Sequence, residues 1–134
     1  MSLNETQVVQ AIYEAFGQRD LAKVFGFFSP DIEIVQSEQL PWGGRYCGHS
    51  EAQRFFDKLT STIRSKVEIE KIIHAGEQVA VIGWTQGVVG LTGADFRVPV
   101  VHVWMVKDGL VTRVQFLIDN PAMLDALMAK PTHA

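Results

Sequence analysis

The chain has few of the features that mark secreted or membrane proteins. Its single cysteine, Cys47, excludes an internal disulfide framework. No apolar run approaches the roughly 20 residues needed to span a bilayer, and the polar start after Ser2 lacks the basic and apolar regions of a signal peptide. We therefore expect a cytoplasmic protein with no membrane partner.

Positive charge and clustered metal ligands are also scarce. Twelve Lys and Arg residues against 15 Asp and Glu give a formal net charge of −3, so nucleic acid is not an expected partner. The four histidines, at 49, 74, 102 and 133, are scattered without Cys or Glu at ligand spacing, and no phosphate-cradling glycine motif occurs. We expect no metal site and no cofactor.

What remains is an ordinary globular composition. With 134 residues, 47% hydrophobic and 20% charged, the chain is long enough to bury one core without disulfides or metal. No repeat, linker or low-complexity stretch divides it. The sequence predicts a single domain over residues 1–134, with a frayed tail at 130–134.

Three helices are predicted in the first half of the chain. Asn4 and Gln7 form a capping box that starts a helix over about 5–16, which Gly17 ends. Asp20 caps a second helix that ends at Ser29-Pro30. A second capping box, Ser50 with Gln53, begins a third helix whose apolar face includes Phe56.

Strands dominate the rest of the chain. Alternating apolar residues predict a short strand at 31–35 and four further strands at 67–74, 78–90, 95–106 and 110–118. Short turns containing Gly76, Gly93 and Gly109 join the last four strands into an antiparallel meander. Strands of this length must bend, and Gly83, Gly87 and Gly90 are suitable bending points. Asn120-Pro121 opens a short final helix.

The predicted elements favour an α+β fold with a cone-shaped, curved antiparallel sheet and three N-terminal helices on its concave face. Thin helices cannot fill a bent sheet, so we expect a conical apolar cavity suited to a small hydrophobic ligand. In strand 95–106 both faces are apolar, which predicts a second covering surface. A homodimer packed through the sheet would provide it.

Several local motifs resemble one known family. The order of elements, the Leu40-Pro41-Trp42-Gly43-Gly44 turn with the following Tyr46-Cys47-Gly48, and the Lys107-Asp108-Gly109 turn are similar to those of SnoaL-like proteins over nearly the full length. These belong to the nuclear transport factor two superfamily, with ketosteroid isomerase, polyketide cyclases, scytalone dehydratase and limonene epoxide hydrolase as relatives. The resemblance implies a cystatin-like α+β cone and a cofactor-independent isomerase, cyclase, dehydratase or hydrolase.

The catalytic residues of these relatives do not carry over. In the resemblance, the general base of ketosteroid isomerase matches Gln36, and its tyrosine falls one residue before Tyr13. Its oxyanion-stabilising acid matches Val101, which would turn inward and leave His102 outward. The acid of the epoxide hydrolases matches Phe116. Any chemistry must therefore use different residues.

Three residues are the candidate catalytic groups. His102 is the one imidazole of its apolar strand and could be a general acid or base, or a core or dimer-interface histidine satisfied by one hydrogen bond. Tyr13 could donate a hydrogen bond to a substrate, or only bury its ring. Asp119 could carry a proton at the pocket mouth, or cap the helix that follows.

Further residues are candidates for binding. The turn containing Trp42 could be a flap over the cavity or an ordinary surface turn. The expected substrate-binding residues are Trp42, Tyr46, Gln36, Phe56, Val101, Phe116 and Ile118. The sequence thus leaves two hypotheses: a cofactor-independent acid/base enzyme acting on a hydrophobic substrate, or a non-catalytic ligand-binding or dimerisation module.

Overall fold

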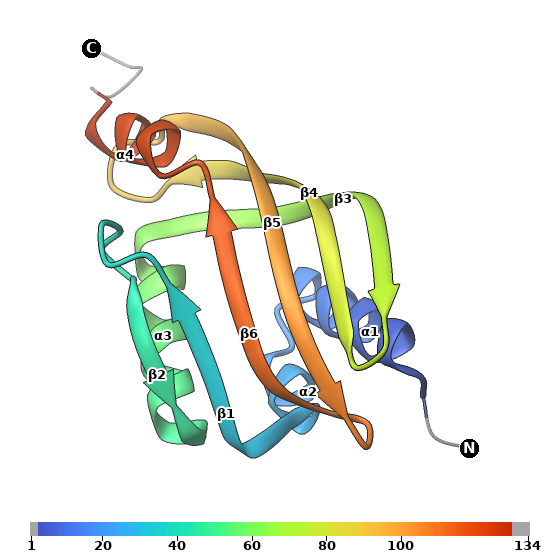
Figure 1. The fold of residues 1–134 in the computed structure, drawn as a ribbon. Helices are drawn as coiled ribbons and strands as arrows, with labels where there is room; N and C mark the ends of the chain where they lie inside the picture. Colours follow the sequence, from blue (N-terminus) through green and yellow to red (C-terminus); the bar gives the residue numbers. More distant parts are fainter. Residues whose placement is uncertain (1–2, 130–134) are drawn as a thin grey trace.

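The computed structural model describes residues 3–129, so the predicted tail from Lys130 lies outside the described residues. The elements run in chain order as α1 Glu5–Gly17, α2 Leu21–Gly26, β1 Phe28–Gln36, β2 Gly44–Cys47, α3 Gly48–Thr62, β3 Ile63–Ala75, β4 Gln78–Val89, β5 Asp95–Lys107, β6 Leu110–Ile118 and α4 Asn120–Met128. Figure 1 shows a curved sheet with α1, α2 and α3 against one side and α4 beyond the end of β6. The expected α+β class and the curved sheet under N-terminal helices are confirmed.

The sheet has six strands in the order β2-β1-β6-β5-β4-β3. The meander from β3 to β6 is antiparallel, as predicted. Two features were not predicted: β1 lies parallel to β6, and the four-residue strand β2 pairs with β1 at the sheet edge. The parallel pair brings the end of β1, from the first third of the chain, beside the end of β6, from its last third, with β5 as the next strand. Both halves of the chain therefore contribute to the concave face.

Local capping explains where the first two helices begin. The side chain of Asn4 accepts from the backbone N–H of Gln7, and the Gln7 side chain accepts from the backbone of Asn4, which confirms the capping box. Asp20 caps α2, also as predicted. The ends differ from the predictions, because Arg19 and not Gly17 takes the left-handed conformation after α1, and α2 ends before β1 begins at Phe28.

The predicted capping box of α3 is wrong. The helix begins at Gly48 with Cys47 as its N-cap, three residues before the expected N-cap Ser50, and the side chain of Cys47 makes no capping hydrogen bond. Instead the carboxylate of Glu51 accepts from the backbone N–H of Cys47 at 2.7 Å. Gly48 has a φ of +81°, and this conformation, unfavourable for other residues, lets β2 turn directly into the helix.

The long strands bend where β4 lacks side chains. A Cβ added at Gly83 or Gly87 would collide with the backbone carbonyl oxygens of Glu68 or Arg64 on β3. The β3–β4 register also shifts between Ile69 and Lys71, next to the pair formed by Ile69 and Gly83. The glycines therefore allow β3 to approach β4 closely at the bend. The three predicted turn glycines, at 76, 93 and 109, all have positive φ.

Candidate functional site

The concave face of the sheet and the three N-terminal helices enclose a cavity of about 80 Å³. Every element except β2 contributes to its wall, and Trp42 contributes from the turn before β2. The lining residues are Ile12, Tyr13, Phe16, Val24, Gln36, Trp42, Phe55, Phe56, Leu59, Ile63, Ser65, Val67, Thr85, Val100, His102, Trp104, Phe116, Ile118 and Met123. The wall is apolar and aromatic except for a few hydroxyl, amide and imidazole groups, and it contains no carboxylate among the described residues.

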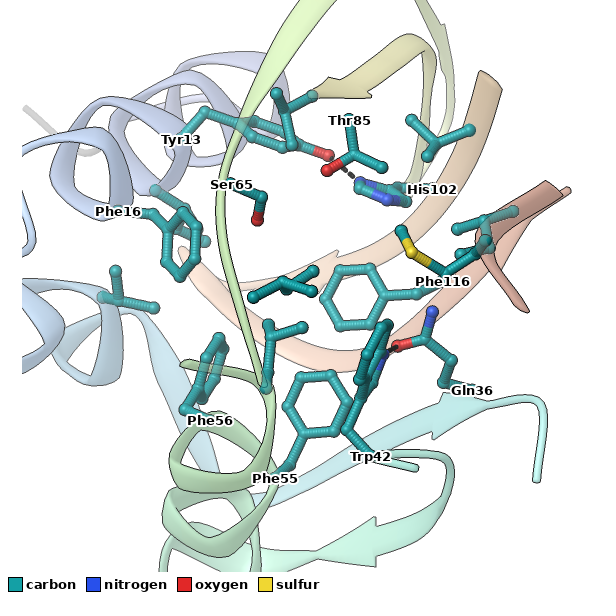
Figure 2. Close-up of a pocket in the computed structure, with 18 of the residues that line it drawn as sticks. Tyr13, Phe16, Gln36, Trp42, Phe55, Phe56, Ser65, Thr85, His102 and Phe116 are labelled. Carbon is teal, nitrogen blue, oxygen red and sulfur yellow. Dashed lines mark hydrogen bonds between the residues drawn. The ribbon is translucent and has the colours of Figure 1, made fainter. Parts of the chain in front are cut away.

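A chain of hydrogen bonds joins three of these residues. The hydroxyl oxygen of Tyr13 lies 2.6 Å from Nδ1 of His102, and the indole nitrogen of Trp104 donates to the same hydroxyl oxygen at 3.0 Å. Tyr13 comes from α1, whereas His102 and Trp104 are two residues apart on the inward face of β5. Figure 2 shows Tyr13 and His102 meeting at one end of the cavity.

The donor roles in this chain follow from the chemistry of the three groups. An indole nitrogen can only donate, so Tyr13 accepts from Trp104 and has its own proton left to donate. No other acceptor for that proton lies within hydrogen-bond distance among the described residues, so we assign it to Nδ1 of His102, which places the imidazole hydrogen on Nε2. Every fully buried side-chain nitrogen and oxygen among residues 3–129 has a partner, and Nε2 has none among those residues. We conclude that Nε2–H opens onto the cavity.

Burial keeps both partners uncharged. Desolvation lowers the pKa of His102 to about 3, so the imidazole is neutral at pH 7. Desolvation likewise raises the pKa of Tyr13 above its ordinary value, and the hydrogen bond from Trp104 opposes this only in part. The site therefore holds a neutral imidazole whose Nε2–H can donate a hydrogen bond.

A second hydrogen bond fixes another polar group of the wall. The indole nitrogen of Trp42 donates to the side-chain oxygen of Gln36 at 2.8 Å. The amide nitrogen of Gln36 has no partner among the described residues. Because every fully buried side-chain nitrogen there has one, this nitrogen is not fully buried and borders the cavity. Trp42 is only 1% exposed, so its turn is anchored in the core and is not the surface turn that the sequence left open.

Several predicted site residues meet at this cavity. Tyr13 and His102 line it together, and the parity expected from the resemblance is wrong, because His102 points inward and Val101 outward. Gln36, Trp42, Phe56, Phe116 and Ile118 also line the cavity.

Three predicted site residues lie elsewhere. Val101 is 37% exposed on the outer face of the sheet, because inward positions on β5 carry even numbers. Tyr46 is buried, but its hydroxyl donates to the carbonyl oxygens of Trp42 and Gly43 and holds their turn. The side chain of Asp119 accepts from the backbone N–H of Ala122, so it caps α4, as the second reading of this residue expected.

Other lining residues were missed by sequence reasoning. Trp104 lies on the same side of β5 as His102, but both sides of this strand are apolar, so no sequence signal indicated that this side faces the cavity. Phe55 lies on the predicted apolar face of α3 with Phe56, and that helical spacing was its signal, whereas Ser65 and Thr85 gave none because their place depends on how β3 and β4 meet α3.

Two further sets of polar side chains are separate from the cavity. Cys47 is exposed, and the ring of His49 bonds to the carbonyl oxygen of Phe28, so these two residues do not form a nucleophile and base. Glu33 forms ion pairs with Arg45 and Arg113. Across residues 3–129, no group of three His, Cys, Asp or Glu side chains could hold a metal ion, and no helix is long and apolar enough to cross a membrane.

Comparison with solved structures supports this fold. An NTF2-like protein of unknown function from Burkholderia pseudomallei is 27% identical, with a TM-score of 0.89 over 95% of this chain and 99% of that one. TerC, co-crystallized with polyporic acid, is 24% identical, with a TM-score of 0.86 over 93% and 98% of the two chains. A proposed polyketide cyclase from Xanthomonas campestris pv. campestris is 23% identical, with a TM-score of 0.81 over 92% and 96%.

No curated protein matches the chain. The family of SnoaL-like domains, however, matches residues 9–114, which include α1 from Val9 and extend to Val114 on β6. This match covers most of the cavity wall, including both partners of the Tyr13–His102 hydrogen bond. The chain therefore belongs to the SnoaL-like family of the NTF2-like superfamily.

Proposed function

We propose that this protein is a cofactor-independent enzyme that isomerises, cyclises or dehydrates a small apolar molecule carrying a carbonyl oxygen. The observation behind this proposal is the hydrogen bond from Tyr13 to Nδ1 of His102, which leaves Nε2–H directed at the cavity. The carbonyl oxygen accepts from Nε2–H, and His102 stabilises the negative charge that develops on this oxygen during the reaction.

A neutral imidazole suits this role. A neutral imidazole polarises a carbonyl by donating a hydrogen bond from its N–H, and it need not carry a positive charge to do so, as in the neutral histidine of triosephosphate isomerase. Tyr13 holds the imidazole ring through Nδ1, and Trp104 in turn holds the hydroxyl of Tyr13. The Nε2–H donor is therefore oriented before the substrate arrives. The wall is mostly apolar, and surroundings of low polarity strengthen a hydrogen bond to a developing oxyanion.

The composition of the wall limits the reaction class. The wall provides no carboxylate base, and the imidazole of His102 and the phenol of Tyr13 are the two titratable groups among the described lining residues. Chemistry of this kind favours rearrangement within one substrate, in which the substrate supplies its own nucleophile or leaving group. Isomerisation, cyclisation and loss of water meet this condition.

The cavity also limits the size of the ligand. Its volume of about 80 Å³ is smaller than the roughly 150 Å³ of an engineered apolar cavity that binds benzene. Even a single ring therefore enters only with some movement of the side chains in the wall. A polycyclic ligand requires movement of side chains such as Phe16 and Phe56, which line the cavity from α1 and α3.

A second candidate function is binding without catalysis. The lack of a lining carboxylate, with Gln36 at the end of β1, favours this alternative. A ligand-binding module would use the same Nε2–H to orient a ligand, but bound molecules would leave unchanged. The two functions therefore differ only in turnover.

We also propose that two copies pair through the outer face of the sheet. Val101 on β5 and Leu117 on β6 are opposite each other in register, and they are 37% and 45% exposed. Ile73 on β3 is 43% exposed and adds apolar surface to the same face, because it pairs with Ala80, which pairs with Val103 in an outward row of β5. Exposed apolar side chains gathered on one sheet favour a partner surface, and a second copy offers the same face.

The proposed function is tested with two substitutions that keep different parts of the imidazole. The amide nitrogen of glutamine reaches the position of Nε2, whereas that of asparagine reaches only the position of Nδ1. We expect His102→Gln to retain binding of small cyclic ketones and His102→Asn to weaken it by about tenfold, the scale of one buried hydrogen bond. Thermal shift with a panel of ketones and their parent hydrocarbons measures this difference.

Turnover separates the two candidate functions. Mass spectrometry of ketones and hydroxyketones incubated with the wild-type protein detects isomerised, cyclised or dehydrated products. Loss of product formation in His102→Asn supports the enzyme. Bound ligands recovered unchanged from the wild type support the binding module, and equal binding by the wild type and His102→Asn contradicts the role of His102 in both.

A further inference from the structure

Two tryptophans determine which polar atoms of the cavity wall are free to bind a ligand. Trp104 donates to Tyr13 and thereby sets the tautomer of His102, as described above. Trp42 donates to the side-chain oxygen of Gln36, and because an indole only donates, the amide NH₂ of Gln36 is the free end. Each free end is a hydrogen-bond donor.

These two donors lie in one row across the sheet. Gln36 on β1 pairs with Phe116 on β6, and Phe116 in turn pairs with His102 on β5. All three side chains line the cavity. Adjacent strands are about 4.8 Å apart, so the Cα atoms of Gln36 and His102 are separated by roughly 10 Å. Figure 2 shows Phe116 between the other two residues.

The floor of the cavity between the donors is aromatic. The ring of Phe116 stacks on Phe55 with centroids 5.5 Å apart and an angle of 7° between the planes. His102 meets the Phe116 ring edge to face at 4.7 Å. The floor therefore offers apolar contact to a ring, while its two sides offer donors.

The polar atoms of the wall also exclude one class of ligand. No carboxylate is among the described lining residues, so an ammonium group entering the cavity would find no compensating charge. A neutral acceptor oxygen, in contrast, meets a donor at either end of the row. A six-membered ring with oxygens at opposite positions, plus hydrogen bonds of about 2.9 Å at each end, is comparable in length to the roughly 10 Å between the Cα atoms of Gln36 and His102, whose side chains leave the same face of the sheet.

We propose that the ligand is a neutral six-membered ring with acceptor oxygens at opposite positions, one bound by Nε2–H of His102 and the other by the amide of Gln36. This proposal rests on the proposed function, because both assume that the ligand occupies the cavity and accepts from His102. It adds a second recognition residue, Gln36, which positions the ring through the oxygen remote from His102. It also limits the ligand to one ring with two oxygens.

Two ketones of nearly equal size test the proposal. Cyclohexane-1,4-dione carries both acceptor oxygens, and cyclohexanone carries one. We expect the wild-type protein to bind the dione about fivefold or more tightly than the monoketone, the equivalent of one net hydrogen bond. In Gln36→Met, the affinity for the dione falls to that for cyclohexanone, while the affinity for cyclohexanone stays within about twofold. Isothermal titration calorimetry or ligand-observed NMR measures these ratios.

A second variant separates the loss of the Gln36 hydrogen bond from a loss of stability. Gln36→Met leaves the indole N–H of Trp42 buried without its acceptor, which costs stability. The double variant Gln36→Met with Trp42→Phe removes both partners, and it is expected to show the same loss of preference for the dione. Retention of that preference in both variants would overturn the role of Gln36.

The outcomes separate this inference from the proposed function. If the wild type binds cyclohexanone and the dione equally, only the second recognition point is wrong. If cyclohexanone binding is lost in His102→Asn but the dione shows no dependence on Gln36, the proposed function stands and the inference fails. If the wild type binds neither ketone, both are wrong.

Discussion

Tyr13 and His102 are 89 residues apart in the chain, yet the hydroxyl oxygen of Tyr13 lies 2.6 Å from Nδ1 of His102. Their rings are nearly parallel, with centroids 5.9 Å apart. The contact ties α1 to β5 across the concave face and orients the imidazole. It therefore serves both the stability of the fold and the proposed chemistry.

Removing the hydroxyl in Tyr13→Phe leaves Nδ1 of His102 and the indole N–H of Trp104 without their partner. Each orphaned buried group costs free energy, so we expect the free energy of unfolding to fall by about 2–4 kcal/mol. The imidazole also loses the donor that fixes its tautomer. ¹⁵N NMR of the His102 side chain is expected to show mainly the Nε2–H tautomer in the wild type and a mixture in the variant. A dominant Nδ1–H tautomer in the wild type would contradict the assigned roles.

The buried imidazole makes stability depend on pH. In the unfolded chain His102 has its ordinary pKa of about 6.5, whereas in the folded protein burial lowers it to about 3. Between these values the unfolded state binds one proton more than the folded state, so the stability present above pH 6.5 is lost as the pH falls toward 3. His102→Gln removes the titratable imidazole, and with it the extra proton that the unfolded state binds. Denaturant unfolding from pH 7 to pH 4 is expected to show a shallower decline for the variant, whereas parallel curves would mean that His102 is protonated in the fold.

The bend of β4 depends on the absence of a side chain at Gly83. In Gly83→Ala the new Cβ collides with the carbonyl oxygen of Glu68, and the β3–β4 pair must separate to relieve it. We expect a loss of about 3 kcal/mol or more in the free energy of unfolding. Gly17→Ala is the matched control, because nothing lies within 4 Å of the added Cβ and φ is not positive. Thermal unfolding compares the two, and equal melting temperatures would show that the sheet relaxes without cost.

Charge on the outer face of the sheet tests the homodimer. Val101→Asp with Leu117→Asp places two carboxylates on adjacent strands of the exposed apolar face, and a dimer interface there would have to bury both. We expect the wild type to sediment as a dimer at micromolar concentration and the double variant as a monomer. Leu91→Asp changes a side chain that is 96% exposed in the turn before β5, and it serves as the control. A monomeric wild type would remove the proposed interface.

Local signals in the sequence were sufficient for many elements. Asn4 with Gln7, and Asp20, cap helices through contacts three residues away, so the chain near them carries the whole signal. The turn glycines at 76, 93 and 109 act in the same local way. The expected capping box at Ser50 failed because the competing turn at Gly48 started α3 earlier, and a pattern of residue types cannot rank two nearby starts.

The sequence by itself determined the α+β class, the meander, the apolar character of the cavity and the importance of His102 and Tyr13 as candidates. Only the tertiary structure decided that these two side chains meet, because their contact depends on the crossing of α1 over β5. The facing of β5 was decided in the same way: an apolar strand with similar residues on both sides carries no periodic signal for which face is inward. Packing against the helices selected the even-numbered face, which turned His102 into the cavity and Val101 to the outside.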